Sequence, residues 1–138
     1  MIRILIADRD RLALSALKTA LDESDAKTTC LASGRQALTA VSESVFDLLV
    51  ADEHLGDMTG LELIESVVTR QPMLNCALVS SLAPGDFHEA SEGLGIVMQL
   101  PVGAVKKEAD QLLEHLRKVE DSSQKAAKHL HRKESCLI

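Results

Sequence analysis

The chain has 138 residues, of which 46% are hydrophobic and 26% charged, and its formal net charge is −6. These values are typical of one globular domain with a sizeable core. Phe occurs twice and Trp and Tyr are absent, so the chain lacks the aromatic platforms on which single-stranded nucleic acid stacks. The acidic charge disfavours contact with a phosphate backbone. We therefore expect no direct binding to nucleic acid.

The sequence also argues against membrane insertion, secretion and a metal site built from cysteines. No run of 18 apolar residues occurs, and the N-terminus has no signal-peptide pattern, so neither a membrane span nor secretion is expected. The three cysteines, Cys30, Cys76 and Cys136, have no metal-ligand spacing. Cys30 and Cys76 lie in apolar runs and are expected to be buried. The chain is expected to be cytoplasmic.

Short apolar runs alternate with helical periods along the chain. A nearly continuous apolar run predicts a strand over Ile2–Ala7, and leucines at helical spacing follow, with Asp10 placed to cap that helix. Later strands are expected at Lys27–Ala32, Phe46–Ala51, around Ala77–Val79 and at Gly95–Gln99, and later helices around residues 37–41, 61–68, 84–93 and 102–119.

This order predicts a (βα)5 α/β fold, in which a parallel sheet is covered by helices on both faces. The natural closure is the flavodoxin-like three-layer sandwich with strand order 2-1-3-4-5. One domain is expected over residues 1–121, with residues 122–138 as a polar tail or a helix extension. Asp8, Asp52 and Ser80 would then all follow strands at one edge of the sheet, where such folds bind ligands.

Several motifs occur in order along residues 2–119. They are the first-strand run ending at Asp8, the turn Ser33-Gly34, Asp52 with Gly60 eight residues later, Val79-Ser80-Ser81 and Pro101. In this set the chain resembles the receiver domain of response regulators in bacterial two-component systems. The resemblance implies that Asp52 is the phosphoacceptor, that Asp8 is a site acid for a Mg2+ ion, and that the Ser80 hydroxyl contacts the phosphoryl group.

Other positions depart from the family pattern. Arg9 stands where the family has a second acid, with Asp10 one residue later as a substitute acid, and Leu100 stands where it has a lysine. Val97 takes the place of the aromatic switch residue, and His54 and Leu82 are expected at the rim of the site. Mg2+ binding is therefore expected to be possible but weakened. Arg9 either pairs with Asp8 and Asp52 in a neutralised cluster or serves as a phosphoryl-binding cation.

The resemblance implies a stand-alone receiver domain, a cytoplasmic phosphoprotein of phosphorelay signalling and not an enzyme. Its partners would be a histidine kinase or a phosphotransfer protein, with a homodimer through helix 4, strand 5 and helix 5 as a further possibility. The alternative is a phosphorylation-independent pseudo-receiver that acts through protein contacts. A small flavodoxin-like enzyme or binding protein is disfavoured, because the chain has neither a Gly-rich phosphate loop nor a catalytic Ser/His/Asp order.

Overall fold

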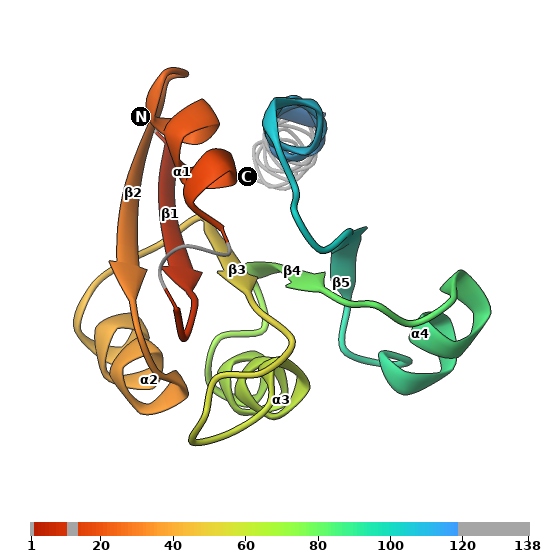
Figure 1. The fold of residues 1–138 in the computed structure, drawn as a ribbon. Helices are drawn as coiled ribbons and strands as arrows, with labels where there is room; N and C mark the ends of the chain where they lie inside the picture. Colours follow the sequence, from red (N-terminus) through yellow and green to blue (C-terminus); the bar gives the residue numbers. More distant parts are fainter. Residues whose placement is uncertain (1, 11–13, 119–138) are drawn as a thin grey trace, which may run out of the picture.

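The computed structural model of the protein describes residues 2–10 and 14–118, and in these a five-stranded parallel sheet of order β2-β1-β3-β4-β5 is flanked by helices (Figure 1). The predicted fold class and strand order are confirmed. The strands are β1 (Ile2–Ala7), β2 (Ala26–Leu31), β3 (Leu48–Ala51), β4 (Asn75–Val79) and β5 (Ile96–Leu100). The helices are α1 (Ser15–Asp22), α2 (Gly34–Glu43), α3 (Gly60–Arg70) and α4 (Pro84–Ala90), and residues 106–118 are also helical.

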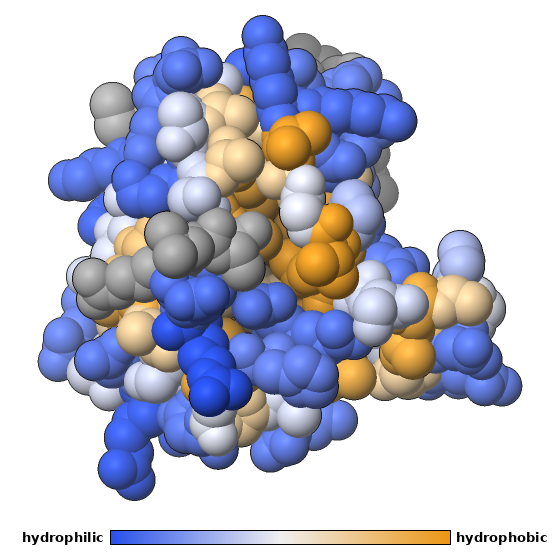
Figure 2. All heavy atoms as spheres, viewed as in Figure 1, coloured by the Kyte–Doolittle hydropathy of each residue, from blue (hydrophilic) through white to orange (hydrophobic). Residues whose placement is uncertain are grey.

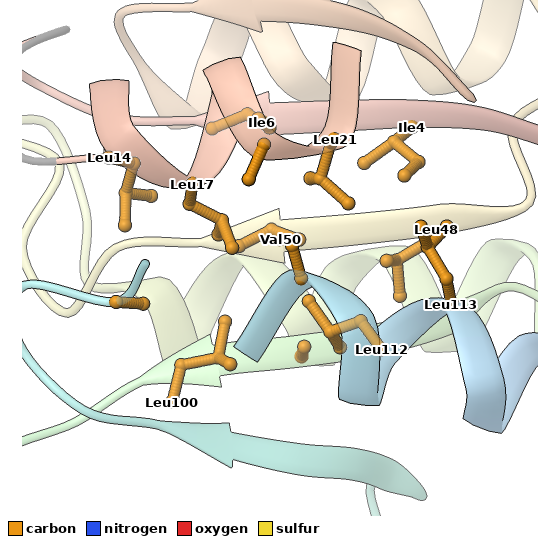
Figure 3. Packing of buried hydrophobic residues seen from close by; sticks show 14 of the residues in the cluster. Ile4, Ile6, Leu14, Leu17, Leu21, Leu48, Val50, Leu100, Leu112 and Leu113 are labelled. Atoms are coloured by element: carbon orange, nitrogen blue, oxygen red, sulfur yellow. The ribbon is translucent and has the colours of Figure 1, made fainter. Parts of the chain in front are cut away.

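Alternate residues of each strand face opposite sides of the sheet and build two separate cores. Ile4 and Ile6 of β1 pack with α1 and the C-terminal helix, whereas Leu5 and Ala7 pack with α2 and α3. This two-residue period explains why the strand sequences are apolar throughout. Figure 3 shows the first core, in which Leu100 of β5 lies near leucines of α1 and the C-terminal helix.

The start of α1 differs from the sequence prediction. The helix begins at Ser15, and Leu14, not Asp10, precedes it. The backbone N–H of Leu14 donates to the Asp8 carboxylate at 3.0 Å, so Asp8 supplies the acceptor that Asp10 was expected to give. A buried carboxylate requires such donors. This requirement explains why the Leu14 N–H binds Asp8 and why Asp10 does not cap the helix.

The third strand is shorter than predicted. Its expected start at Phe46 is wrong, because the Asp47 carboxylate accepts the N–H of Arg3 at 2.8 Å and regular pairing with β1 begins at Leu48. Instead, the guanidinium of Arg3 lies over the ring of Phe46, with Arg3 Cζ 5.4 Å from the ring centre. Strand β1 has the predicted bounds, both ends of β2 and β5 differ by one residue from their expected positions, and β4 starts two residues earlier than expected.

The helix α4 differs from the other labelled helices because none of its residues is buried. It projects beyond the edge strand β5 (Figure 1). Of the cysteines, Cys76 is buried as expected, and burial raises the pKa of its thiol to about 12, whereas Cys30 is half-buried. Among the described residues, no helix combines the length and apolar character needed to cross a membrane. The predicted tail, residues 122–138, lies outside the described residues.

Candidate functional site

The carboxyl ends of the central strands bring the predicted site residues together. The N–H of Asp52 donates to the Ala7 carbonyl at 2.9 Å, which places Asp52 beside Asp8. The N–H of Ser80 donates to the Leu100 carbonyl at 3.0 Å. Residues after β1, β3 and β4 therefore meet at one edge of the sheet, as the strand order predicts.

Gly60 sets the spacing between the candidate acceptor and α3. A Cβ atom at this position would overlap the backbone oxygen of Asp52 and the side chain of Leu78. The first turn of α3 therefore rests directly on the end of β3, and only glycine leaves room for this approach. Close packing of α3 against the end of β3 thus explains why glycine stands eight residues after Asp52.

Asp52 is half-buried, and its pKa is raised above the ordinary value of 3.8. Burial is the main cause, and the charges of Asp8 and Glu53 add to it. The Glu53 N–H, which donates to Oδ1 at 2.8 Å, and the His54 side chain act in the opposite direction. The Asp52 carboxyl therefore lies in surroundings that disfavour its negative charge.

Asp8 is only 1% exposed, and both of its oxygens bind backbone amides. Oδ1 accepts the N–H of Asp10 at 3.2 Å, and Oδ2 accepts the N–H of Leu14 at 3.0 Å. Asp10 itself is exposed. Asp8 therefore holds the backbone amides of Asp10 and Leu14, and these two bonds satisfy its buried carboxylate.

Arg9 lies against the loop that follows Asp52. Within the described part of the chain it forms no ion pair with Asp8 or Asp52, so the predicted neutralised cluster is wrong. Its side chain lies over Gly56, where a Cβ would be 3.7 Å from Arg9 Cδ. The physical reason is that backbone amides already satisfy Asp8, and the loop after Asp52 offers a surface for the long arginine stem.

The same loop forms an open hollow of about 380 Å³, which Asp52 itself does not line. Arg9 and His54 line it together with residues 56–59 and one residue of α3, which are Gly56, Asp57, Met58, Thr59 and Glu62. His54 is exposed, as expected at the rim, and pairs with Thr59 in a short antiparallel bridge. The hollow therefore presents both signs of charge.

Ser80 is 6% exposed and belongs to a fixed loop. Its Oγ accepts the N–H of Leu82 at 3.2 Å. The Gln99 amide donates to the carbonyl oxygens of Ser80 at 3.3 Å and Leu82 at 2.8 Å. Leu82 is 42% exposed.

The two altered positions on β5 are apolar and packed. Leu100 is 0% exposed and belongs to the first core, so the position that holds a lysine in the family carries no donor. Val97 is half-buried against the same core. It falls where the pairing of β4 with β5 shifts register, between the pairs Cys76–Ile96 and Ala77–Met98. Neither side chain offers a polar group to the site.

Two acidic residues have roles that the sequence did not reveal. Asp57 accepts the N–H groups of Gly34 at 3.0 Å and Arg35 at 2.9 Å, and these bonds lower its pKa. Glu53 accepts hydrogen bonds from Ser81. These partners lie 22 to 28 residues away. The one available signal was the strand order, which brings these loops to the same edge.

The donor set was compared with what Mg2+ requires, which is an octahedron of oxygen ligands. Both Asp8 oxygens are engaged by amides, and Arg9 stands in place of the second acid. Within the described ranges, no group of three or more His, Cys, Asp or Glu side chains is placed to hold a metal ion. These residues do not fit the ion that receiver domains typically use for phosphorylation.

Comparison with known proteins identifies the fold family. Residues 4–117 match the model of the response regulator receiver domain. A CheY-like receiver domain from Methanospirillum hungatei has a TM-score of 0.79 at 24% identity, covering 88% of this chain and 98% of its own. The chemotaxis response regulator CheY4 of Vibrio cholerae has a TM-score of 0.75 at 17% identity, covering 84% and 98%. NtrX from Brucella abortus has a TM-score of 0.80 at 15% identity, covering 93% and 29%. A search of curated proteins found no match.

Proposed function

Because the chain belongs to the response regulator receiver domain family and so has a role in two-component signalling, we propose that it acts there as an interaction module without Mg2+-dependent phosphorylation of Asp52. Receiver domains are generally signalling modules rather than enzymes, and the family implies contact with histidine kinases or phosphotransfer proteins. We further propose that the protein has no catalytic activity of its own and that it is cytoplasmic.

The burial of Leu100 is the observation that carries the proposal. At this position the family places a lysine, which neutralises the phosphoryl group, whereas here the side chain is fully buried in an apolar core. Loss of a single donor to a transition state typically costs about 10²–10³ in rate. Phosphoryl transfer depends almost entirely on such positioned charges, so this one replacement is expected to be severe.

The acids at the end of β1 support the same proposal. Asp8 is already committed to two backbone amides. The adjacent residue is a cation, which repels a divalent metal ion instead of binding it. We infer that Mg2+ affinity is weakened by both effects.

The surface next to the site supports a role in protein contacts. Leu82, Val102 and Val105 are 42%, 69% and 48% exposed, and Figure 2 shows apolar residues (orange) gathered over β5 and α4. A contiguous exposed apolar patch marks a site of interaction with another protein. This region is where we propose the partner contact, or a homodimer, with no contact to nucleic acid.

A second candidate function is phosphorylation of Asp52 supported by Arg9. The hollow in the loop that follows Asp52 is lined by Arg9 and His54, and an arginine guanidinium can bind phosphoryl oxygens in a bidentate manner. In this alternative, Arg9 would move toward Asp52 and supply the positive charge that the lysine and the metal ion give in other receivers.

The test is incubation of the full chain with acetyl phosphate and Mg2+, followed by intact mass measurement. The proposal predicts no phosphoryl adduct under conditions that phosphorylate a receiver with the complete acid pair and lysine. An adduct that disappears in Asp52→Ala would contradict it and favour the Arg9-supported alternative.

Thermal unfolding with Mg2+ and beryllium fluoride, a phosphoryl mimic, gives an independent measurement. A ligand that binds the native state must raise stability. The proposal predicts the same Tm with and without the mimic, for the wild type and for Asp52→Ala. A rise confined to the wild type would show a working phosphoryl site.

A further inference from the structure

A hydrogen-bonded contact joins the loops after β3 and β4. Glu53 Oε1 accepts the Ser81 N–H at 3.2 Å and the Ser81 hydroxyl at 3.0 Å, and Oε2 lies 3.2 Å from the same hydroxyl. The two residues are 28 positions apart in the chain. A charged acceptor shared by two donors is among the stronger hydrogen-bonded contacts.

The contact completes the anchoring of residues 80–82. Ser80 is held by its N–H bond to Leu100, and Leu82 by its N–H bond to the Ser80 hydroxyl. The Gln99 amide binds the carbonyl oxygens of both. Glu53 is the residue that ties Ser81, between them, to the end of β3. Each of the three loop residues is thus attached to a strand end or to a neighbour.

The position of this contact relates it to the acceptor. Glu53 directly follows Asp52, and Ser81 directly follows Ser80, the residue expected to contact a phosphoryl group. A phosphoryl group on Asp52 would need N–H and O–H donors from the end of β4 to balance its oxygens. The Glu53 carboxylate has taken the two donors of Ser81.

We propose that Glu53 is a positioning residue that does permanently what a phosphoryl group would do transiently, holding the loop after β4 closed against the end of β3. This inference rests on the proposed function, because a loop that Glu53 already holds in place needs no phosphorylation to adopt that conformation. The loop carries the exposed side chain of Leu82. Glu53 therefore sets the position of an apolar side chain on the proposed contact surface.

The charge of Glu53 supports the same role. It is among the causes that raise the pKa of Asp52, after burial and together with Asp8, so the two carboxylates are close enough to repel. A phosphoryl group would add further negative charge to this environment. Glu53 therefore both occupies the donors and opposes the modification.

Amide hydrogen exchange of the full chain by NMR tests the proposal. In Glu53→Ala the exchange rate of the Ser81 amide should rise by about tenfold or more, the size expected when a bond to a charged acceptor is lost. Amides in the cores of β1 and β3 should keep their rates. An unchanged Ser81 rate, or an equal rise throughout the sheet, would overturn the proposal.

Glu65→Ala is the matched control, since Glu65 is an exposed glutamate of α3 and its loss removes the same charge. It should leave the Ser81 amide unchanged. A titration of the Asp52 carboxyl by NMR adds a readout that a merely structural role would not move: its pKa should fall in Glu53→Gln, because one neighbouring negative charge is gone, and should not move in Glu65→Gln.

The two proposals can fail separately. Phosphorylation of the wild-type chain by acetyl phosphate would contradict the proposed function whatever the exchange data show. An unchanged Ser81 amide in Glu53→Ala would remove the positioning role and leave the absence of phosphorylation standing.

Discussion

At the scale of single residues, the surroundings of Asp52 favour the protonated form of its carboxyl group. Its pKa is raised, mainly by burial, so in the folded state the carboxyl keeps its proton to a higher pH than in the unfolded chain. The stability that this preference contributes is present below the ordinary pKa of 3.8 and is lost as the pH rises through the folded-state pKa. At neutral pH the ionised side chain therefore costs stability.

We predict that Asp52→Asn raises the Tm at pH 7 and that the gain shrinks below pH 3.8, where the wild-type carboxyl is protonated in both states. The asparagine oxygen can still accept the N–H of Glu53. Thermal unfolding followed by circular dichroism at the two pH values measures the effect. Asp110→Asn, at an exposed helix position, is the control. A lower Tm for Asp52→Asn at pH 7 would contradict the prediction.

The residue-level predictions from sequence succeeded where a residue's place follows from the strand order. Asp8, Asp52 and Ser80 come together because each follows a parallel strand. The prediction that Arg9 pairs with Asp8 and Asp52 failed, because the direction of a long side chain depends on which donors and acceptors are already satisfied. The roles of Glu53 and Asp57 were missed for a similar reason, since their partners are remote in the chain and the order of strands does not fix loop geometry.

At the scale of the elements, the contact between β3 and α3 depends on one missing side chain. Gly60 begins α3 directly against the Asp52 carbonyl and Leu78. By contrast, Gly85, in the first turn of α4, has no atom within 4 Å of the place where a Cβ would stand. The two glycines therefore allow a direct comparison of a packed and an open site.

We predict that Gly60→Ala lowers the free energy of unfolding by about 1–3 kcal/mol or more, because the new methyl group meets backbone atoms that cannot move aside. Gly85→Ala should be neutral or stabilising by up to about 1 kcal/mol, since alanine is the better helix former. Urea denaturation of both variants measures the difference. Equal stabilities would mean that α3 does not need this close approach.

Element boundaries were predictable to within a few residues, and the exceptions have identifiable causes. The Ile2–Ala7 strand was predicted at its observed bounds, because a continuous apolar run can only be buried on both faces of a sheet. The start of α1 was wrong because the Asp8 carboxylate takes the N–H of Leu14, and the start of β3 was wrong because Asp47 binds back to Arg3. In both cases a side chain acting on a distant backbone group overrides local propensity.

At the scale of the whole molecule, the sheet separates two cores, and Leu100 fills the end of one of them near the site. A polar residue in this position would have to leave the core to reach Asp52. The Leu100 side chain therefore contributes to the apolar packing that stabilises the whole domain. The overall fold was predictable because this packing follows the two-residue period of the strands and the helical spacing between them.

We predict that Leu100→Ala lowers the free energy of unfolding by about 2–5 kcal/mol, the usual cost of a cavity in a core. Leu82→Ala, at a position 42% exposed, should change it by less than about 0.5 kcal/mol. Urea unfolding followed by circular dichroism and by methyl NMR signals gives the values. A small effect of Leu100→Ala would mean that this end of the core contributes little to stability.

The anchoring of the loop between Asp52 and Gly60 has a consequence for how the domain tolerates change in length. Asp57 is bonded to the first amides of α2, the Leu55 N–H to the Met58 carbonyl, and the Gly60 N–H to the Glu53 carbonyl. An inserted or deleted residue here would pull Asp57 off one helix and shift the start of another. By contrast, nothing surrounds the Cβ positions of Gly85 and Gly93. We therefore expect an inserted residue near Gly85 or Gly93 to be tolerated better than one between Asp52 and Gly60.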